Sequence, residues 1–312
     1  MEKVTHMKFL YNGMDIISSS KPSTMFVNDY AGGEADELIT TFPNAKLWAT
    51  WKPKTGDTVQ LIDGSFDSGI LYIYNPQIQN NICRLEAISV PNSARKPRTK
   101  IWRDVRLTNI ISDCASRAGL SFQTYGIVDY TYTAISQNSE SDFAFLKRIC
   151  TREGYAVKVS NNTLIVFSEK YMENQPSGMT INKKEVSPAY AFQNTYDLLS
   201  KVRVCHYNVT KKQNIDQTAK DTSIIGGEMK VNELCSDSGE ALRFAYGYLG
   251  NVNKNRKIGY IQLLQQAELA AGSVITLDGF DGENNGNWFV YRVGQDAVNA
   301  RTELFLRRPL NY

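Results

Sequence analysis

The sequence predicts a mainly β chain that contains two duplicated β-barrel domains and a small α/β domain as an α+β insert between them. Three observations support this fold class. Residues 55–91 and 271–309 read as two copies of one β-hairpin unit. Short alternating segments separated by turn residues fill both ends of the chain. The clearest helical patterns lie together in the middle, near residues 108–119 and 139–154.

The two hairpin units share the order of their strands, glycines and turns. Gly64 corresponds to Gly279, Gly69 to Gly286 and Tyr74 to Tyr291, with small gaps. Identity is low, but shared order and spacing favour duplication over chance. A duplicated barrel gives one chain two equivalent docking faces. Three such chains would present six, which indicates a ring or symmetry adaptor rather than an enzyme with one pocket.

Composition excludes several classes of protein. The formal net charge of +3 over 312 residues is too small to indicate nucleic-acid binding. The cysteines are odd in number, far apart and without a CxxC pair, so we expect buried reduced thiols rather than disulfides or a zinc site: Cys83, Cys114, Cys150, Cys205 and Cys235. No apolar run approaches 18 residues and the first residues lack a signal-peptide pattern, so we expect cytoplasmic synthesis and no membrane anchoring.

The first third reads as β structure. Residues 8–11 lead into Asn12-Gly13, a strong signal for a two-residue hairpin turn. Strands are expected at Thr24 to Tyr30, Asp36 to Phe42, 57–62, 69–75 and 82–90. Asn80-Asn81 is expected to turn the last pair, since Asn tolerates positive φ.

The middle third predicts a compact α+β insert over about 104–170. Its first helix is expected to start at Thr108 as N-cap and to end at Gly119. Its second helix is expected to open at Ser139, with Asp142 in the place of a capping-box acid, and to end at Gly154. Phe143, Leu146, Ile149 and Cys150 are its expected buried stripe, and Ala156 to Phe167 reads as a hairpin turning at Asn161-Asn162.

The last third returns to β structure. Strands are expected at 197–207, 257–264, 273–278, 287–293 and 301–307, whereas 208–237 has no clear pattern. Glu240 to Leu249 is expected to be helical, although Gly247 weakens the pattern by about 1 kcal/mol.

We expect three domains: a first barrel over 1–92, a linker and insert over 93–184, and a second barrel with one helix over 185–312. Residues 91–103 and 173–184 read as connectors. The first connector carries five cations, which indicate either a solvated basic linker or a positive rim that meets an acidic partner: Arg95, Lys96, Arg98, Lys100 and Arg103.

A search for catalytic, metal-binding or cofactor-binding chemistry assigns no residue and no cofactor. His6 lies near the N-terminus, and the alternation around His206 favours an ordinary strand residue over a base or ligand. The loop Asp278–Asn287 suggests either a plain hairpin loop or a cation site, but its spacing does not match an EF-hand. Glu140 and Asp142 form a carboxylate pair, which first-turn capping and the helix dipole explain without acid–base chemistry.

Four motifs in order carry a resemblance to a known family. Residues 139–155 read Ser-Glu-Ser-Asp-Phe-Ala-Phe-Leu-Lys-Arg-Ile-Cys-Thr-Arg-Glu-Gly-Tyr. Residues 33–38 are followed by Leu47-Trp48 and Gly56-Asp57, and residues 271–274 are followed by Glu303-Leu304 and 307–310. These motifs resemble the late-control-D family of baseplate hubs of contractile phage tails and tail-like particles. They are also similar to the hub part of type VI secretion spike proteins.

The resemblance implies a homotrimer whose six barrels form a pseudo-sixfold trimeric ring, which adapts a hexameric tail tube to a trimeric central spike. It implies partners in the tube, the spike and other baseplate proteins, with tape-measure protein, or DNA in a phage, passing through the lumen. Gly56 and Gly272 would then be turn residues at the start of barrel strands. We expect assembly in the bacterial cytoplasm, incorporation into a virion or tail-like particle, and a spike that is a separate protein.

Two other functions stay open at this level. One is a tail module that binds cell wall or carbohydrate. The other, less favoured because no motif supports it, is a lytic enzyme that uses Glu140 or Glu153.

Overall fold

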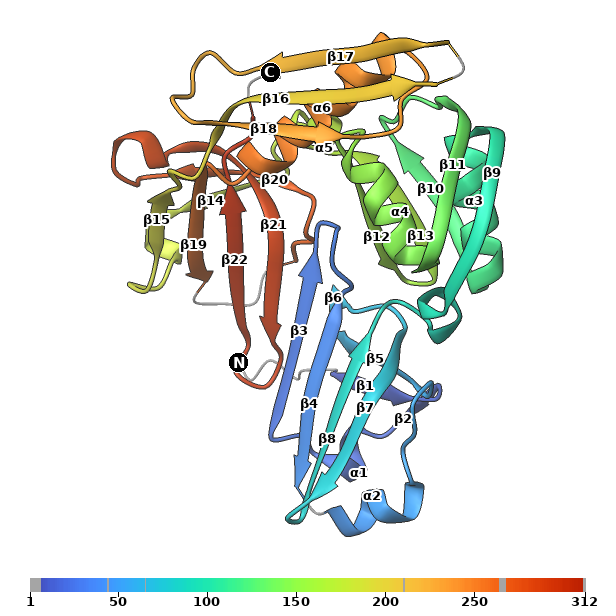
Figure 1. Cartoon of the computed structure of the whole chain (residues 1–312). Helices are drawn as coiled ribbons and strands as arrows, with labels where there is room; N and C mark the ends of the chain where they lie inside the picture. Colours follow the sequence, from blue (N-terminus) through green and yellow to red (C-terminus); the bar gives the residue numbers. More distant parts are fainter. Residues whose placement is uncertain (1–6, 44, 65, 210, 264–267, 311–312) are drawn as a thin grey trace.

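One long sheet organises the molecule (Figure 1). This computed structural model describes residues 7–43, 45–64, 66–209, 211–263 and 268–310, and His6 and Leu264 therefore lie outside the described residues. Within that part of the chain, 14 strands join in one sheet whose main path runs β15-β19-β22-β21-β3-β4-β8-β7-β5-β1-β2. The prediction of a mainly β chain with an α/β insert is confirmed.

The first β unit lies at the base of Figure 1, and its strands agree with most of those predicted for the first third of the chain. Asn12 and Gly13 have φ of 47° and 81°, and Asn80 and Asn81 have φ of 49° and 63°, as the predicted hairpin turns require. Two short helices, which the sequence did not signal, close the barrel. The elements are β1 Lys8–Tyr11, β2 Met14–Asp15, α1 Ile17–Ser20, β3 Thr24–Tyr30, β4 Glu37–Pro43, α2 Ala45–Trp51, β5 Thr58–Asp63, β6 Phe66–Asp67, β7 Leu71–Gln79 and β8 Ile82–Ile88.

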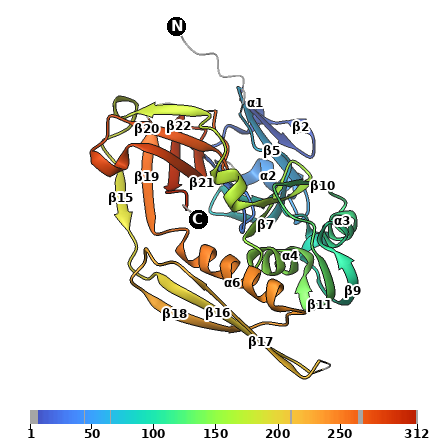
Figure 2. The same ribbon diagram turned by 90° about the horizontal axis from the view of Figure 1, so that it is seen from above.

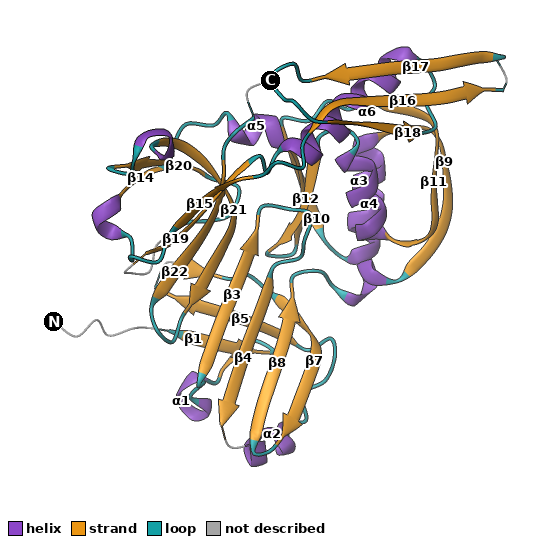
Figure 3. Cartoon of the chain, turned by 60° about the vertical axis from the view of Figure 1, so that its left-hand side comes forward, coloured by secondary structure: helices purple, strands orange, loops and turns teal. Residues whose placement is uncertain are grey.

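The insert follows as a separate α/β layer. A three-stranded sheet ordered β10-β13-β12 packs against the helices α3 and α4, and a two-stranded ladder of β9 and β11 lies on their other side (Figure 3). The elements are η1 Asn92–Arg95, β9 Pro97–Arg106, α3 Leu107–Ala118, β10 Ser121–Tyr125, β11 Thr131–Ser141, α4 Asp142–Thr151, β12 Tyr155–Ser160, β13 Thr163–Ser168 and α5 Glu169–Glu173.

The last third contributes strands to two sheets. β14, β15 and β19 to β22 extend the long sheet, whereas β16, β17 and β18 form a separate sheet backed by α6 (Figure 2). The elements are β14 Met179–Asn182, η2 Lys183–Glu185, β15 Ala191–Asn194, β16 Leu199–Asn208, β17 Gln213–Lys220, β18 Gly227–Asn232, α6 Ser238–Asn253, β19 Lys257–Leu263, β20 Val274–Asp278, η3 Gly282–Asn284, β21 Gly286–Asp296 and β22 Arg301–Arg307.

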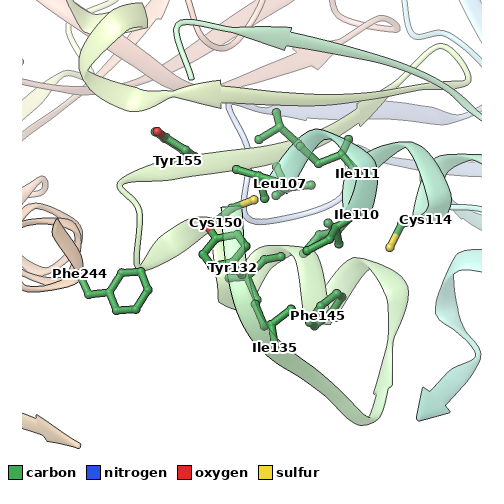
Figure 4. Close-up of a cluster of buried hydrophobic side chains, with 14 of the residues drawn as sticks. Leu107, Ile110, Ile111, Cys114, Tyr132, Ile135, Phe145, Cys150, Tyr155 and Phe244 are labelled. Carbon is green, nitrogen blue, oxygen red and sulfur yellow. The ribbon is translucent and has the colours of Figure 1, made fainter. Parts of the chain in front are cut away.

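Three large hydrophobic cores correspond to these layers, and a small fourth cluster consists of Ala31, Val274 and Phe289. One lies inside the first β unit and one inside the second. The third joins the insert to α6 and the β16–β18 sheet, with Tyr132, Phe145 and Phe244 among its buried rings (Figure 4). The division of the chain at residues 92 and 184 stays a prediction. Every helix in the described residues is too short or too polar to cross a bilayer.

Both expected connectors contain regular structure, so those two predictions were wrong. Pro97–Arg106 forms β9, which pairs with β11 from Arg106↔Thr131 to Pro97↔Ser141. Met179–Asn182 forms β14, which pairs in parallel with β20. Their exposed polar residues resemble linker sequence because each strand packs at the margin of its sheet, where few side chains are buried.

Both insert helices start elsewhere than predicted. Arg106 occupies the N-cap position of α3, and Thr108 inside the helix donates its hydroxyl to Asp129. Ser141, not Ser139, caps α4 by accepting a bond from the Ala144 N–H, because Ser139 with φ 52° sits at an irregularity in β11. Of the predicted stripe, Phe143 is only partly buried and Phe145 takes its place in the core.

Candidate assembly interface

The two β units repeat one hydrogen-bonding plan. In the first, the Gly56 N–H donates to Ile73 O and the Ile73 N–H donates to Asp57 O, both at 2.8 Å. In the second, Gly272, Val290 and Ser273 make the same two bonds at 2.8 and 2.9 Å. Gly56 and Gly272 have φ of 95° and 99°, so the prediction that they are turn residues is confirmed.

A β-bulge falls at the same place in both units. The β7·β8 register shifts between Ile73 and Asn75, which leaves Tyr74 as the extra residue. The β21·β22 register shifts between Val290 and Arg292, which leaves Tyr291 as the extra residue. Tyr74 and Tyr291 are the pair that the sequence comparison aligned. Bulges are specific features of a strand pair, so this coincidence supports duplication of the unit.

The next strand of each unit is in the same register. Leu38 of β4 pairs with Ala87, and Gly259 of β19 pairs with Leu306. Ala87 and Leu306 are equivalent because each faces the residue that precedes a bulge. β3 and β15, which pair with β4 and β19, are therefore the equivalent outer strands of the two units.

The two units join through backbone hydrogen bonds. The part of β21 beyond its bulge pairs antiparallel with β3, from Arg292↔Tyr30 to Asp296↔Phe26. Bonds from Ala31 N to Tyr291 O (2.9 Å) and from Ala297 N to Met25 O (3.0 Å) close both ends of the junction. The Arg292 guanidinium lies 3.7 Å from the ring centre of Phe305 and covers the joint.

The strands equivalent to β21 and β3 each have one edge without a described partner strand. The part of β7 beyond its bulge, Asn75 to Gln79, pairs with β8 on one side and with no described strand on the other. β15 is the outermost strand at the opposite end (Figure 1). The chain thus contains one complete junction, between β21 and β3, and two unpaired strand edges, on β7 and β15, that could form a second one.

Buried charges fasten the layers to one another. Lys158 of β12 makes ion pairs with Asp29 and, at 3.7 Å, with Asp36, and Asp29 also accepts a bond from the Ala271 N–H at 2.8 Å. Burial raises the pKa of Asp36 to about 8, although Lys158 opposes the shift. Burial alone would lower the pKa of Lys158, but the carboxylates of Asp29 and Asp36 raise it.

Ion pairs with a buried partner also connect other layers of the molecule. Arg307, whose side chain is 3% exposed, pairs with Glu173 at 2.8 Å and connects β22 to α5. Arg152 pairs with Glu233 at 2.9 Å, and Arg243 pairs with Glu153 at 2.7 Å, which connects the insert to the α6 layer. The sequence pattern missed these pairs because their partners lie far apart along the chain. The one local signal was a lysine at position 158 between valines in a buried strand.

The carboxylates considered for acid–base chemistry are held in such pairs. Glu153 has a fully buried side chain bonded to Arg243 and Tyr132. Glu140 is held by Arg148, and Asp142 by Arg117 and Gln137. Burial raises the pKa of the Cys83, Cys114 and Cys235 thiols to about 12, whereas Cys205 is partly exposed. His206 pairs with Ile215 inside the β16·β17 ladder.

The structure also shows where the loop and the basic cluster singled out in the sequence lie. The loop Asp278–Asn287 joins β20 to β21 as a hairpin, with reciprocal bonds between Phe280 and Asn285. Lys100 of the basic cluster pairs with Asp113 at 2.7 Å, and Arg98 with Asp142 at 3.4 Å. Phe289 and Leu304 of the second unit point into hydrophobic cores at 1% and 0% exposure, so neither side chain is available for a contact between chains.

Comparison with known proteins shows the fold. No family model and no curated protein matches the chain. Among solved structures, it is similar to a tail protein from Neisseria meningitidis, with a TM-score of 0.76 and 11% identity over 97% of this chain and 96% of that one. It is also similar to the 43 kDa tail protein of prophage MuSo2 from Shewanella oneidensis, with a TM-score of 0.75 and 9% identity over 98% of both chains.

A more distant likeness extends to secretion systems. An E. coli protein described as a component of the type VI secretion system has a TM-score of 0.57 and 11% identity, over 96% of this chain and 76% of that one. At sequence identities this low, the structural similarity shows a shared fold and nothing more. The resemblance predicted from four sequence motifs is therefore confirmed as a fold shared with tail proteins of this kind.

Proposed function

We propose that this chain is a structural baseplate hub of a contractile tail or tail-like injection particle. Three copies form a ring that adapts a six-fold tail tube to a three-fold central spike, and the chain is not an enzyme. The observation that carries the proposal is the β21·β3 junction inside one chain, together with its two open equivalents on β7 and β15. The fold shared with tail proteins supports the same function.

In the proposed ring, β7 of one copy pairs with β15 of the next as β21 pairs with β3 within a copy. Such a head-to-tail contact generates a closed ring when its rotation closes. With three copies, six equivalent β units are joined by hydrogen-bonded junctions that alternate between those within one chain and those between two chains. The number three comes from the resemblance to hub proteins, whereas the type of contact comes from the internal junction.

Equivalence also predicts the register of the contact between copies. Gly294 pairs with Asn28 within the chain. Counting from the bulges, Gln77 corresponds to Gly294, and counting along the outer strands, Gln193 corresponds to Asn28. Gln77 of one copy is therefore opposite Gln193 of the next, and Ile78 is opposite Phe192. Ile78 is 39% exposed in the isolated chain, and this contact would cover it.

The sheet face away from the cores would line the lumen of this ring. Arg307, which also lies on this face, is buried against Glu173. The other charges of this face in β4, β8, β21 and β22 nearly balance, with three arginines against four carboxylates: Arg84, Arg292, Arg301, Glu37, Glu86, Asp296 and Glu303. Several are already paired, such as Arg84 with Glu86 at 2.8 Å. A nearly neutral, internally paired wall binds a passing polyanion or polypeptide weakly. This suits passage of tape-measure protein or DNA, and the small basic excess of the chain lies elsewhere.

Disulfide trapping tests the ring. The double variant Gln77→Cys/Gln193→Cys should form a covalent species of about three times 35.1 kDa, roughly 105 kDa, under oxidising conditions, because directly opposite residues are within disulfide reach. Each single variant should stay at the mass of one chain, which controls for the native thiols. The double variant Gln77→Cys/Asn194→Cys, shifted by one residue, points its thiols to opposite faces and should cross-link poorly.

Native mass from light scattering completes the test. A trimer near 105 kDa, alone or with the spike protein added, supports the hub. A stable monomer with the spike protein present, and no cross-link in the matched cysteine pair, contradicts it.

A further inference from the structure

A second open strand edge lies on the insert, away from the proposed ring contact. β9 and β11 form a two-stranded ladder, and β9 is the one described strand that pairs with β11. Proteins normally protect such edges with charges, prolines or glycines. β9 carries charged side chains at half of its ten positions: Arg98, Lys100, Arg103, Asp104 and Arg106. Residues 131–137 of β11 contain no charged residue, no proline and no glycine.

The backbone of β11 points hydrogen-bonding groups away from β9. The Arg148 guanidinium donates to Ser136 O at 2.7 Å, so this carbonyl faces outward and already has one hydrogen-bond partner. In an antiparallel ladder the N–H and C=O of one residue face the same side, and this side alternates along the strand. The Ser136 N–H and both backbone groups of Ala134 therefore face outward as well. Tyr132 and Ile135 turn their side chains into the core beneath them, which fixes the strand (Figure 4).

The open edge borders a groove with an apolar far wall. The groove encloses about 510 Å³ and is lined on one side by residues 133–136 of β11. On the other side β16 and β17 continue as a two-stranded ribbon, because β18 pairs with β16 only as far as Cys205. This wall exposes three apolar side chains, Tyr207 at 52%, Val209 at 76% and Leu234 at 56%. One bound segment in this groove could therefore meet backbone hydrogen-bonding groups on one side and apolar side chains on the other.

The remaining charge in the groove is positive. Arg152 pairs with Glu233, Arg148 pairs with Glu140, and Glu240 lies 3.8 Å from the Arg243 guanidinium. Lys211, at the ribbon end, approaches the Ser236 carbonyl at 3.4 Å and has no carboxylate within ion-pair distance among the described residues. A guest with acidic groups would satisfy it.

We propose that the outward edge of β11 at residues 132–136 binds an extended, weakly acidic segment of a partner protein as an added strand. Strand addition draws its affinity from main-chain hydrogen bonds and its selectivity from alternate side chains, which here meet Tyr207, Val209 and Leu234. The site lies on the insert, so it can act whether or not the chain forms the ring. It gives the insert a function, the capture of a neighbouring protein.

Peptide binding tests this proposal on the purified full chain. The probe is a fluorescein-labelled peptide of alternating threonine and valine with an aspartate at each end. Fluorescence anisotropy should show saturable binding below about 1 mM, the range of weak recognition. Replacing the central valine by proline should weaken binding at least about tenfold, because it removes a ladder donor. Replacing the aspartates by lysines should weaken it about threefold or more, because Lys211 then repels them.

Matched variants locate the site. Ala134→Pro removes an outward N–H and should abolish binding, whereas Ala134→Ser keeps that donor and should bind as the native chain does. Lys211→Glu should reverse the preference between the aspartate and lysine peptides. Amide hydrogen exchange at Ala134 and Ser136 should slow when the peptide is bound.

The proposal is overturned if no saturable binding occurs up to about 1 mM, the weak limit of specific recognition. It is also overturned if a folded Ala134→Pro binds as tightly as Ala134→Ser. Should Ala134→Pro fail to fold, the Lys211→Glu preference and the exchange rates decide. Unchanged values for both would reject the site.

Discussion

The first and second β units keep the same backbone plan and differ in nearly everything that covers it. Both have a left-handed glycine before the first strand, a bulge in the second and matching registers in the third and fourth. The first is closed by β1, antiparallel to β5, with a ring cluster that includes Phe42 and Trp48 at 4.6 Å. The second is closed by β14, parallel to β20, with Phe192 and Trp288 at 5.2 Å.

The difference teaches that the two units share the register and the edges of their strands, and not their cores. Backbone hydrogen bonds between strands need correct register and an open side, but no particular side chains. The cores could therefore diverge while the edge geometry was kept. The attachments to the insert diverged too, because Arg307 of the second unit, which pairs with Glu173, corresponds to Ile88 of the first.

The largest expected loss of stability comes from breaking the ion pairs that attach the insert to the first β unit. Lys158→Ala removes the buried cation that the partly exposed Asp29 and the buried Asp36 share, and it should lower the free energy of unfolding by about 3–5 kcal/mol. Lys147→Ala, an exposed lysine on the nearby helix α4, should change it by less than about 0.5 kcal/mol. Urea denaturation measures both, and equal effects would show that the buried cluster does not fasten the layers.

Equivalent core positions should respond alike. Leu85 and Leu304 occupy matching places beside Thr40 and Ile261, and both are fully buried. Each change to Ala should cost about 2–5 kcal/mol from lost burial and the cavity that remains. A cost at Leu304 near zero would mean that the second unit is packed less tightly than the first, which would weaken the comparison.

The ionic joint also predicts a pH dependence. The pKa of Asp36 is raised in the folded chain to about 8, so the folded state binds a proton that the unfolded state releases near pH 4. The unfolding free energy should therefore fall as pH rises from about 4 to about 8. Asp36→Asn, which mimics the protonated form, should flatten this dependence in thermal denaturation at several pH values. A native profile that stays parallel to the variant's would argue against a protonated Asp36.

The two left-handed glycines give a smaller, paired effect. Gly56→Ala and Gly272→Ala place a side chain at φ of 95° and 99°, with no atom closer than 3.5 Å to the added methyl group. Backbone strain alone should then cost about 1–2 kcal/mol in each unit. Denaturation midpoints that differ strongly between the two variants would break the equivalence of these turns.

A substitution at the open edge of β15 should change the stability of one chain least and its assembly strongly. Gln193→Lys adds a charge to the open edge of β15 and should change the stability of one chain by less than about 0.5 kcal/mol. The same change should prevent the ring from closing, as judged by light scattering. Asn214→Lys, on the exposed strand β17, is the matched control and should leave the native mass unchanged.

Local signals in the sequence determined the strands of both units, the Asn-Gly and Asn-Asn turns of the first unit, the equivalence of Tyr74 with Tyr291, and the presence of two insert helices. These features depend on neighbours within a few residues, such as alternation of side chains or tolerance of positive φ. The same reasoning misjudged β9 and β14, whose polar residues form strands because partners elsewhere in the chain supply the hydrogen bonds.

Tertiary structure alone decided how the parts meet. Gly247 weakens α6 by its helix propensity, yet a methyl group there would lie 2.1 Å from the Arg152 carbonyl oxygen, so the close approach of α6 to the insert requires glycine. Lys158 and Asp29 are 129 residues apart, and β3 meets β21 across more than 260. No local pattern reports such distances, because register between remote strands and the pairing of buried charges exist only once the chain has folded.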